Sequence, residues 1–281
     1  MKTPIVFVHR GNQEYIKYSL LQASKCNPDS TIYLVGDASN KHYHNYKDNI
    51  VWKSADDYLC DKRETFMGSY KHMSTNPPHY EVVCIERWFI TKEFMKRENL
   101  EYAFISDTDV LIYCDIDRVR RNNFSNVRCT LTHNVSAGIS FINDRTILEE
   151  HCDYVTDCYS GKNPLAFERA RTHFLLLQHF GKPGGVCDMT WWGYFRILHP
   201  PADFGESMAI IKEEDGAFTT LDHNINVSYG YEMENGIKKF KFKKGVPYCY
   251  NETYDLEVKF NCIHFQGQPA KQLMRSFYEI K

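Results

Sequence analysis

Two carboxylates stand one residue apart where an apolar segment ends. Phe104-Ile105-Ser106 leads into Asp107-Thr108-Asp109, and a second apolar segment follows at 110–113. Side chains alternate along an extended chain, so both carboxylates are expected to point the same way. Paired carboxylates repel one another unless a cation neutralises them, and a hard divalent ion is their natural partner. The spacing predicts a metal that could bridge a diphosphate; the alternative is a solvated strand end.

A second candidate group lies near the end of the chain, in Cys262-Ile263-His264-Phe265-Gln266-Gly267-Gln268-Pro269-Ala270-Lys271. A histidine in an apolar strand is more often a core residue. Together with the two aspartates, His264 is a candidate third metal ligand. Gly267 would let the backbone approach phosphate oxygens, and Lys271 could hold a phosphate as a point charge.

Alternating strands and helices in the first third of the chain would position these residues. Residues 5–9 form an apolar run, Asn12 can cap a helix that follows, and 31–35 form a second strand ending at Gly36-Asp37. This order predicts a parallel βαβ unit with a right-handed crossover. The aspartates follow a further strand at 102–106, and open α/β sheets bind ligands at the carboxyl ends of their strands.

The remainder of the chain gives weaker signals. Residues 38–80 are polar and irregular, which predicts a long and mobile loop over the site. Helices are expected at 80–97, 145–159 and 164–181, and strands at 128–132, 138–143 and 258–265. Asn235-Gly236 predicts a hairpin within 229–242. The chain contains no internal repeat, linker or low-complexity segment, so one compact domain is expected.

Composition excludes several classes of protein. The net charge of −2 over 281 residues provides no basic field for nucleic acid. Aromatic residues make up 15% of the chain, and they could line a sugar site or fill a core. The ten cysteines form no C-x-x-C pair, which argues against a zinc ribbon and favours a reduced, cytoplasmic protein. No apolar run is long enough to cross a membrane.

The order of these motifs resembles the GT-A glycosyltransferases over residues 4–271. The opening IVFVHRGN resembles their nucleotide-binding start, and FISDTDVLIY resembles their D-x-D motif. HFQGQPAK resembles the HFxGxxK ending of glycogenin-like and lipopolysaccharide galactosyltransferase-like enzymes, with the lysine one position later. The resemblance implies an α/β GT-A fold, with a Rossmann-like, mainly parallel sheet flanked by helices and a smaller acceptor-side β region. It implies a single domain over 1–281, with a nucleotide-donor half at 1–113 and an acceptor half at 114–281.

The resemblance also implies an activity and a set of site residues. A sugar would pass from a UDP-sugar to a hydroxyl of a glycan, with Mn²⁺ or Mg²⁺ held by Asp107, Asp109 and His264. The residues implied to contact the nucleotide and donor are His9, Arg10, Gly11, Asn12, Asp37, Arg87, Asp107, Thr108, Ala137, Gly138, Gly267 and Lys271. The alternative is an ordinary surface cation for Arg87 and simple strand packing for Ala137 and Gly138.

An inverting transfer needs a carboxylate that takes the proton of the attacking hydroxyl. Asp188 follows a glycine turn at Gly184-Gly185 and is the expected base, with Asp203 and Glu206 in reserve. Trp191 and Trp192 could stack on the acceptor sugar. Asp188 could instead be a helix N-cap and the tryptophans core residues. The HFQGQPAK motif favours a retaining enzyme. The likeness to a xylosyltransferase that is described next favours inversion, and inversion is what we expect.

In length and composition the chain is similar to glycosyltransferases encoded by chloroviruses, among them a UDP-xylose-dependent β-xylosyltransferase acting on the N-glycan of the capsid protein. This likeness implies xylose as the sugar, a viral glycoprotein glycan as acceptor and the host cytoplasm as location. Two rival classes are a sugar-phosphate nucleotidyltransferase, which usually carries a richer glycine loop after the first strand, and a non-catalytic sugar-binding module. The second would not need the aspartates and His264 together.

Overall fold

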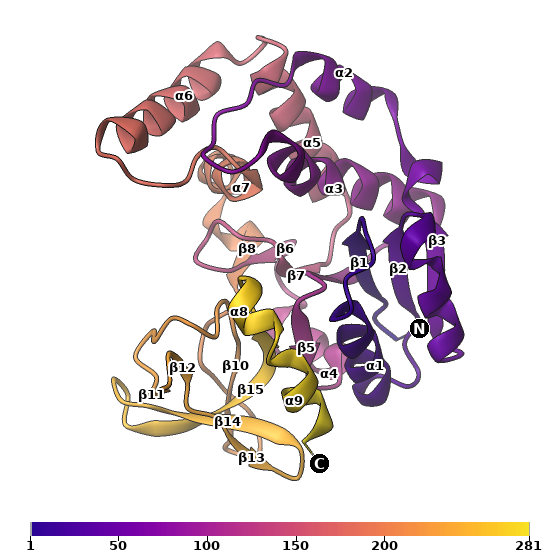
Figure 1. The fold of residues 1–281 in the computed structure, drawn as a ribbon, viewed down its shortest axis with the longest axis vertical. Coiled ribbons are helices and arrows are strands. Elements are labelled where there is room, and N and C mark those ends of the chain that lie inside the picture. The colour runs from indigo at the N-terminus through magenta and orange to yellow at the C-terminus, as the bar shows by residue number, and fades with distance from the viewer. Residues whose placement is uncertain (1, 281) are drawn as a thin grey trace.

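The computed structural model describes residues 2–280 and is built around a seven-stranded sheet (Figure 1). The strand order is β3-β2-β1-β4-β7-β6-β8. The strands are β1 (Ile5–His9), β2 (Ile32–Gly36), β3 (Ile50–Ser54), β4 (Ala103–Ser106), β6 (Cys129–Leu131), β7 (Ile139–Ile142) and β8 (Phe204–Glu206). β1 pairs in parallel with both β2 and β4, and β2 with β3, so the carboxyl ends of these strands share one edge.

Helices cover both faces of this sheet. One apolar core lies under α2 (Asp61–Ser69), α3 (Pro78–Arg97), α5 (Thr146–Tyr159) and α7 (Asp188–Ile197), and a second lies under α1 (Ile16–Cys26) and α4 (Ile116–Val119). α6 (Pro164–His179) projects from the helical layer, and the side chain of Asn163 caps it as expected (Figure 1). The predicted α/β class, with a mainly parallel sheet flanked by helices, is confirmed.

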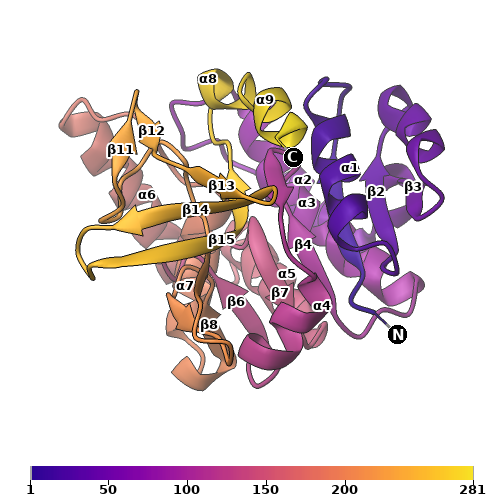
Figure 2. The same cartoon turned by 90° about the horizontal axis from the view of Figure 1, so that it is seen from below.

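A second sheet is built mainly from the last third of the chain. Its path is β13 (Lys241–Lys243), β14 (Val246–Asn251), β15 (Leu256–His264), β10 (Phe218–Leu221) and β9 (Ile211–Lys212). β5 (Val110–Ile112) also pairs with β15, although it directly follows the first sheet's β4. Figure 2 shows the two sheets side by side, with α8 (Gln268–Lys271) and α9 (Met274–Glu279) close to α1. This sheet is the smaller β region that the sequence predicts.

The predicted hairpin is present as β11 (Met233–Glu234) and β12 (Ile237–Lys238). The two residues between its strands have positive φ, 51° at Asn235 and 81° at Gly236. This is the conformation that a two-residue turn with right-handed strand twist requires.

Two sequence-based expectations differ from the structure. Residues 38–80 are not a structureless loop, because they contain a 3₁₀ segment at Ala38–Tyr46, the edge strand β3, and α2. Asn12 does not cap α1, which begins at Ile16 after Tyr15. The seven-stranded sheet spans the proposed halves 1–113 and 114–281, since β4 pairs with β7 across that boundary, and the assignment of these halves to donor and acceptor stays a prediction.

Two further features bear on the environment of the chain. All ten cysteines are free thiols, and six of them are buried. Between residues 2 and 280, every helix is too short or too polar to cross a lipid bilayer.

Candidate functional site

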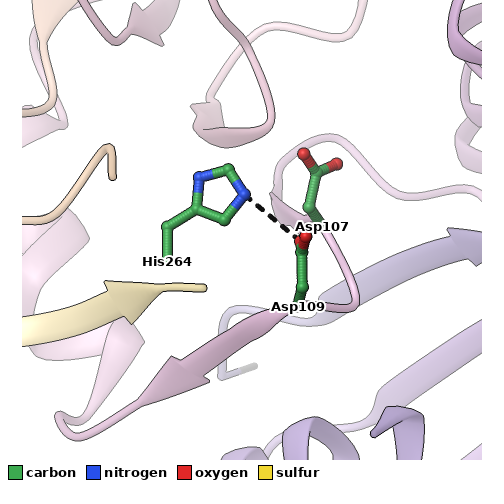
Figure 3. A group of neighbouring side chains, drawn as sticks. All are labelled: Asp107, Asp109 and His264. Carbon is green, nitrogen blue, oxygen red and sulfur yellow. Dashed lines mark ion pairs between the residues drawn. The ribbon is translucent and has the colours of Figure 1, made fainter. Parts of the chain in front are cut away.

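The two sheets meet where Asp107, Asp109 and His264 come together (Figure 3). β4 ends at Ser106, the aspartates occupy the turn that follows, and β5 begins at Val110. Antiparallel pairing places Val110 opposite His264, and the backbone N–H of Phe265 donates to the carbonyl of Asp109 at 2.8 Å. Segments about 155 residues apart in sequence are therefore brought together by backbone pairing.

The three side chains form a group that can hold a metal ion. One ligand atom from each lies within 4.8 Å of the other two, and His264 Nε2 lies 3.2 Å from Asp109 Oδ1. Ligand atoms around one hard cation lie about 3–4.5 Å apart when each bond is about 2.1 Å long. His264 Nδ1 is buried without a hydrogen-bond partner among the described residues. Small side-chain movements would let two oxygens and one nitrogen share one ion, so the residues fit the predicted metal.

Cationic side chains surround the same carboxylates. Lys271 Nζ lies 3.1 Å from Asp109 Oδ2, although its motif position is one residue later than in the family it resembles. Arg87 forms an ion pair with Asp107, and its other terminal nitrogen lies 2.7 Å from Asp188 Oδ2. Lys271 and Arg87, the two predicted phosphate ligands, thus neutralise the acidic centre in this structure.

The pKa values of the three metal-ligand candidates move away from their ordinary values, upward for Asp107 and His264 and downward for Asp109. Burial raises the pKa of Asp107, and the charge of Arg87 offsets that effect only in part. Burial alone would raise the pKa of Asp109 too, but His264 and Lys271 outweigh it and hold that pKa far below its usual range. Burial would lower the pKa of His264, whereas the attraction of Asp109 raises it to about 9. The centre is therefore strongly polarised around Asp109.

Gly138 leaves room for the carboxylate of Asp107, while its predicted contact with the donor sugar stays a prediction. Its carbonyl accepts a hydrogen bond from the N–H of Asp107 at 2.7 Å. A Cβ atom at position 138 would lie 2.5 Å from Asp107 Oδ2. Any side chain at this position would displace the carboxylate.

Other predicted donor-side residues lie at the carboxyl ends of β1 and β2. His9 Nδ1 and Thr108 Oγ1 lie 2.7 Å apart, which connects the end of β1 to the aspartate turn. Asp37 Oδ2 accepts from the N–H of Gly11 at 2.6 Å, and its other oxygen accepts from Ser39. Burial alone would raise the pKa of Asp37, but these hydrogen bonds lower it, so the carboxylate is ionised.

The remaining predicted donor-side residues differ from one another in burial and in the groups they contact. Arg10 lies 3.5 Å from the buried carboxylate of Glu86, and Asn12 is exposed beyond the end of β1. Gly267 precedes α8 as its N-cap residue and has a φ of 87°, a conformation that favours glycine. Ala137 is only 1% exposed and packs in the core, which fits the alternative of simple strand packing, and its contact with the donor sugar stays a prediction.

The predicted acceptor-side residues lie deeper than expected. Trp191 and Trp192 are fully buried, and the ring of Trp192 stacks on the buried His151 at 3.8 Å with an angle of 8°. Neither indole has an exposed face, which fits the alternative of core residues, and their stacking on an acceptor sugar stays an untested prediction. Asp188 begins α7 rather than capping it, and it accepts hydrogen bonds from Arg87 at 2.7 Å and Trp88 Nε1 at 3.2 Å.

Two aromatic residues near the centre were missed. Lys271 Nζ lies 5.0 Å from the ring centroid of Tyr15, and the ring of His223 lies 6.2 Å from that of His264. Neither residue stands in a recognisable motif, and each is brought to the site by packing between distant segments. A sequence signal for them is lacking because the contacts are purely tertiary.

Two large cavities lie on either side of the turn between β6 and β7. One, of about 720 Å³, is lined by α6 and α7 and by three basic side chains, Arg169, His173 and Arg196. The other, of about 580 Å³, lies between β8 and the second sheet and is lined by His133 and several aromatic residues. The acidic centre itself is filled by the side chains that pair with it.

No family model matches the chain, and no curated protein matches it in sequence. Among solved structures, mouse xyloside xylosyltransferase 1 in its apo form is similar with a TM-score of 0.46 and 11% identity, covering 73% of this chain and 85% of that one. The galactosyltransferase LgtC, in complex with donor and acceptor sugar analogues, has a TM-score of 0.40 and 13% identity over 69% of this chain and 70% of its own. The PaToxG glycosyltransferase has a TM-score of 0.41 and 12% identity, covering 71% and 70%. Because these values are low, the chemistry must be inferred from the chain's own residues.

Proposed function

We propose that the protein is a metal-dependent glycosyltransferase of the GT-A type, which transfers a sugar from a UDP-sugar to a hydroxyl of a glycan. One observation carries the proposal: Asp107, Asp109 and His264 converge within 4.8 Å at the carboxyl ends of parallel strands. This edge is where open α/β sheets bind nucleotides. Oxygen and imidazole ligands suit Mn²⁺, or Mg²⁺ with a less typical nitrogen ligand.

The bound ion would supply charge stabilisation for the diphosphate as it leaves the sugar. Lys271 and Arg87 supply the protein's own positive charge at the same place. In the present arrangement Lys271 pairs with Asp109 and Arg87 with Asp107. We propose that both cations turn to the phosphates when donor and metal bind, because the metal takes over the neutralisation of the carboxylates.

The nucleoside would lie beside the ends of β1 and β2. His9 is held by Thr108, and the ionised Asp37 is held by Gly11 and Ser39. A carboxylate fixed in this way can accept a hydrogen bond from a ribose hydroxyl or from the uracil N–H. Arg10, Asn12 and Gly267 complete the proposed donor surface.

The contacts of Asp188 suit a residue that positions Arg87 better than they suit the catalytic base. Arg87 and Trp88 both donate to Oδ2 of this carboxylate and the N–H of Met189 donates to Oδ1, so these donors occupy most of its acceptor sites. We propose that Asp188 orients Arg87. An inverting transfer would then use Glu206, the reserve candidate that faces a cavity, since Asp203 lies near Arg128 instead. A retaining transfer would need no base, and the anomeric proton coupling of the product distinguishes the two.

Xylose is the donor sugar we propose, on the sequence likeness to chlorovirus xylosyltransferases, with a glycan of a viral glycoprotein as acceptor. The same likeness, together with ten free thiols, supports the cytoplasm of a host cell as the location. A screen of UDP-xylose, UDP-galactose, UDP-glucose and UDP-N-acetylglucosamine with Mn²⁺, following UDP release, tests the donor.

Calorimetry with UDP tests the class of protein. Tight UDP binding that requires Mn²⁺, followed by donor turnover, is the expected result. Saccharide binding with no UDP or metal requirement would instead identify a sugar-binding module. Release of pyrophosphate from UTP in the presence of a sugar phosphate would identify a nucleotidyltransferase.

A further inference from the structure

The cavity between β8, β10 and the turn that joins β14 to β15 has a distinctive lining. Four aromatic side chains face it: Phe218, Tyr229, Tyr231 and Tyr254. Glu206 and Asn251 add a carboxylate and an amide. The volume of about 580 Å³ lies within the range of small-molecule sites.

Neighbouring imidazole rings extend from this cavity to the acidic centre formed by Asp107, Asp109 and His264. His133 lines the cavity, and its ring lies 5.2 Å from the ring of His223, which lies 6.2 Å from the ring of His264. The ring of Tyr229 also contacts that of His133, with 4.7 Å between the ring centroids. A ligand in the cavity would therefore lie two side chains away from a proposed metal ligand.

The backbone is strained at the point where the cavity meets these neighbouring rings. His133, Asn134 and Tyr229 have φ values of 52°, 60° and 48°, in the left-handed region that bulky residues rarely adopt. Such conformations persist where surrounding structure imposes them, and they cluster at ligand-binding sites. Here they direct two of the rings into the wall of the cavity.

The charges of the cavity select a neutral ligand. Among the described residues that line it there is no lysine or arginine, and the nearby Lys238 is fully buried against Asp222 at 2.8 Å. Glu206 Oε1 accepts hydrogen bonds from the N–H groups of His133 and Met208, both at 3.1 Å. This fixes a negative charge in the wall, which would repel phosphate and carboxylate ligands.

We propose that this cavity binds a neutral saccharide, which is the acceptor of the transfer. Aromatic faces pack on the C–H face of a pyranose, and the Glu206 carboxylate can accept bonds from its hydroxyl groups. The cavity at α6 and α7 is a poorer candidate, because its three basic side chains suit an anionic ligand. The identification of the saccharide as acceptor rests on the proposed function, whereas saccharide binding itself does not.

Tyr254→Ala tests the site with little risk to folding, because Tyr254 is 65% exposed. Phe180→Ala is the matched control, since Phe180 is 67% exposed at the end of α6 and lines neither cavity. Saturation-transfer NMR would measure binding of lactose, cellobiose and xylobiose, with sialyllactose as an anionic comparison. We expect Tyr254→Ala to weaken binding of at least one neutral disaccharide about tenfold, the loss of one stacking contact. Phe180→Ala should leave that binding unchanged.

Separate measurements distinguish the two proposals. UDP affinity with Mn²⁺ and donor hydrolysis, measured on the unsubstituted protein, report the proposed function, whereas the saccharide titrations report the cavity. If saccharide binding is seen and is sensitive to Tyr254 but UDP does not bind, the cavity is a saccharide site and the transferase proposal fails. If no neutral disaccharide binds, or if Phe180→Ala rather than Tyr254→Ala weakens binding, the assignment of the cavity is overturned.

Discussion

Two buried histidines have opposite surroundings in this protein. His264 is 6% exposed, touches Asp109 and lies beside Asp107, whereas the 1% exposed His151 lies among Trp88, Trp192 and Phe195. The pKa of His264 is raised to about 9 by the carboxylates, against the opposing effect of burial. Burial alone lowers the pKa of His151 to about 3. One imidazole is held in a charged centre and the other in an apolar core.

The difference between the two histidines shows why a buried cluster of carboxylates indicates a binding site, whereas a buried cluster of aromatic residues indicates a core. Carboxylates are costly to bury, so two of them within one site require a cation, a proton or a ligand. Aromatic side chains gain free energy from burial alone, and a pair such as Trp191-Trp192 needs no ligand. The acidic motif therefore indicated a site, whereas the tryptophan pair indicated a core that packs α7 against α5.

Removing the charge at the acidic centre should have the largest effect. Asp109→Asn is expected to lower donor turnover about 10⁴-fold, about 5 kcal/mol, because it removes a proposed metal ligand next to the departing phosphate. Initial rates of UDP release with saturating Mn²⁺ measure it. Asp29→Asn, at an exposed position, is the control. Turnover close to wild type in Asp109→Asn would show that the acidic centre is not the site.

Truncating the aromatic core should affect folding and leave chemistry intact. Trp192→Ala is expected to reduce the free energy of unfolding by about 4 kcal/mol, since a fully buried indole is lost. Urea unfolding measures this change, with the exposed Phe180→Ala as control. The Michaelis constant for acceptor, measured on folded protein, should not change. A raised constant with unaltered stability would restore the tryptophans to the acceptor site.

Lowering the pH should reduce the free energy of unfolding through His151, the histidine in the aromatic core. A folded-state pKa of about 3, below the ordinary value near 6.5, means that the unfolded state binds the proton first. This contribution to stability is present above pH 6.5 and is lost as the pH falls towards 3. Between pH 6.5 and 4.5 the loss is about 2 kcal/mol, because the full slope of about 1.4 kcal/mol per pH unit is reached only below pH 6.5.

The variant His151→Phe should remove that part of the pH dependence, because phenylalanine cannot take up a proton. Unfolding free energies at several pH values measure it, and His173→Phe at an exposed position serves as control. An unaltered slope in His151→Phe would mean that His151 is not neutral in the folded state, and the contrast with His264 would disappear.

The smallest expected effect concerns the cation nearest Asp109. Lys271→Met should weaken UDP binding in the presence of Mn²⁺ about tenfold, because one charged contact to a phosphate is lost. Calorimetric titration measures it, with Lys162→Met, at a 74% exposed side chain, as control. UDP affinity that is unaffected would limit Lys271 to neutralising Asp109.

Much of the first sheet could be predicted from sequence. β1, β2 and β4 are apolar and buried, so their residues form uninterrupted hydrophobic runs. β3 was missed because it is an edge strand with mainly half-buried residues, and α2 because Phe66 is its only fully buried side chain among the described residues. Neither element has the clear periodicity that sequence interpretation needs.

The candidate site was predictable where residue type limits the alternatives. Asp107 and Asp109 lie between two apolar strands and His264 ends a third, so charged groups next to apolar segments are visible in the sequence. Lys271 lies near Asp109 despite its shifted position, because its long side chain and the short α8 absorb one residue. The cavity lined by Tyr229 and Tyr254 was not predictable, since five separate segments of the chain form it.

The pairing of β5 with β15 has a consequence for how the molecule opens. Because Asp109 precedes β5 and His264 ends β15, an ion held by both would join the second sheet to the first at a single point. Any partial opening that separates β15 from β5 would have to release that ion. Saturation with Mn²⁺ at 100 times its dissociation constant would oppose such an opening by about 2.7 kcal/mol. Amide hydrogens of β14 and β15 should then exchange with solvent about a hundredfold more slowly, while those of β3 keep their rates.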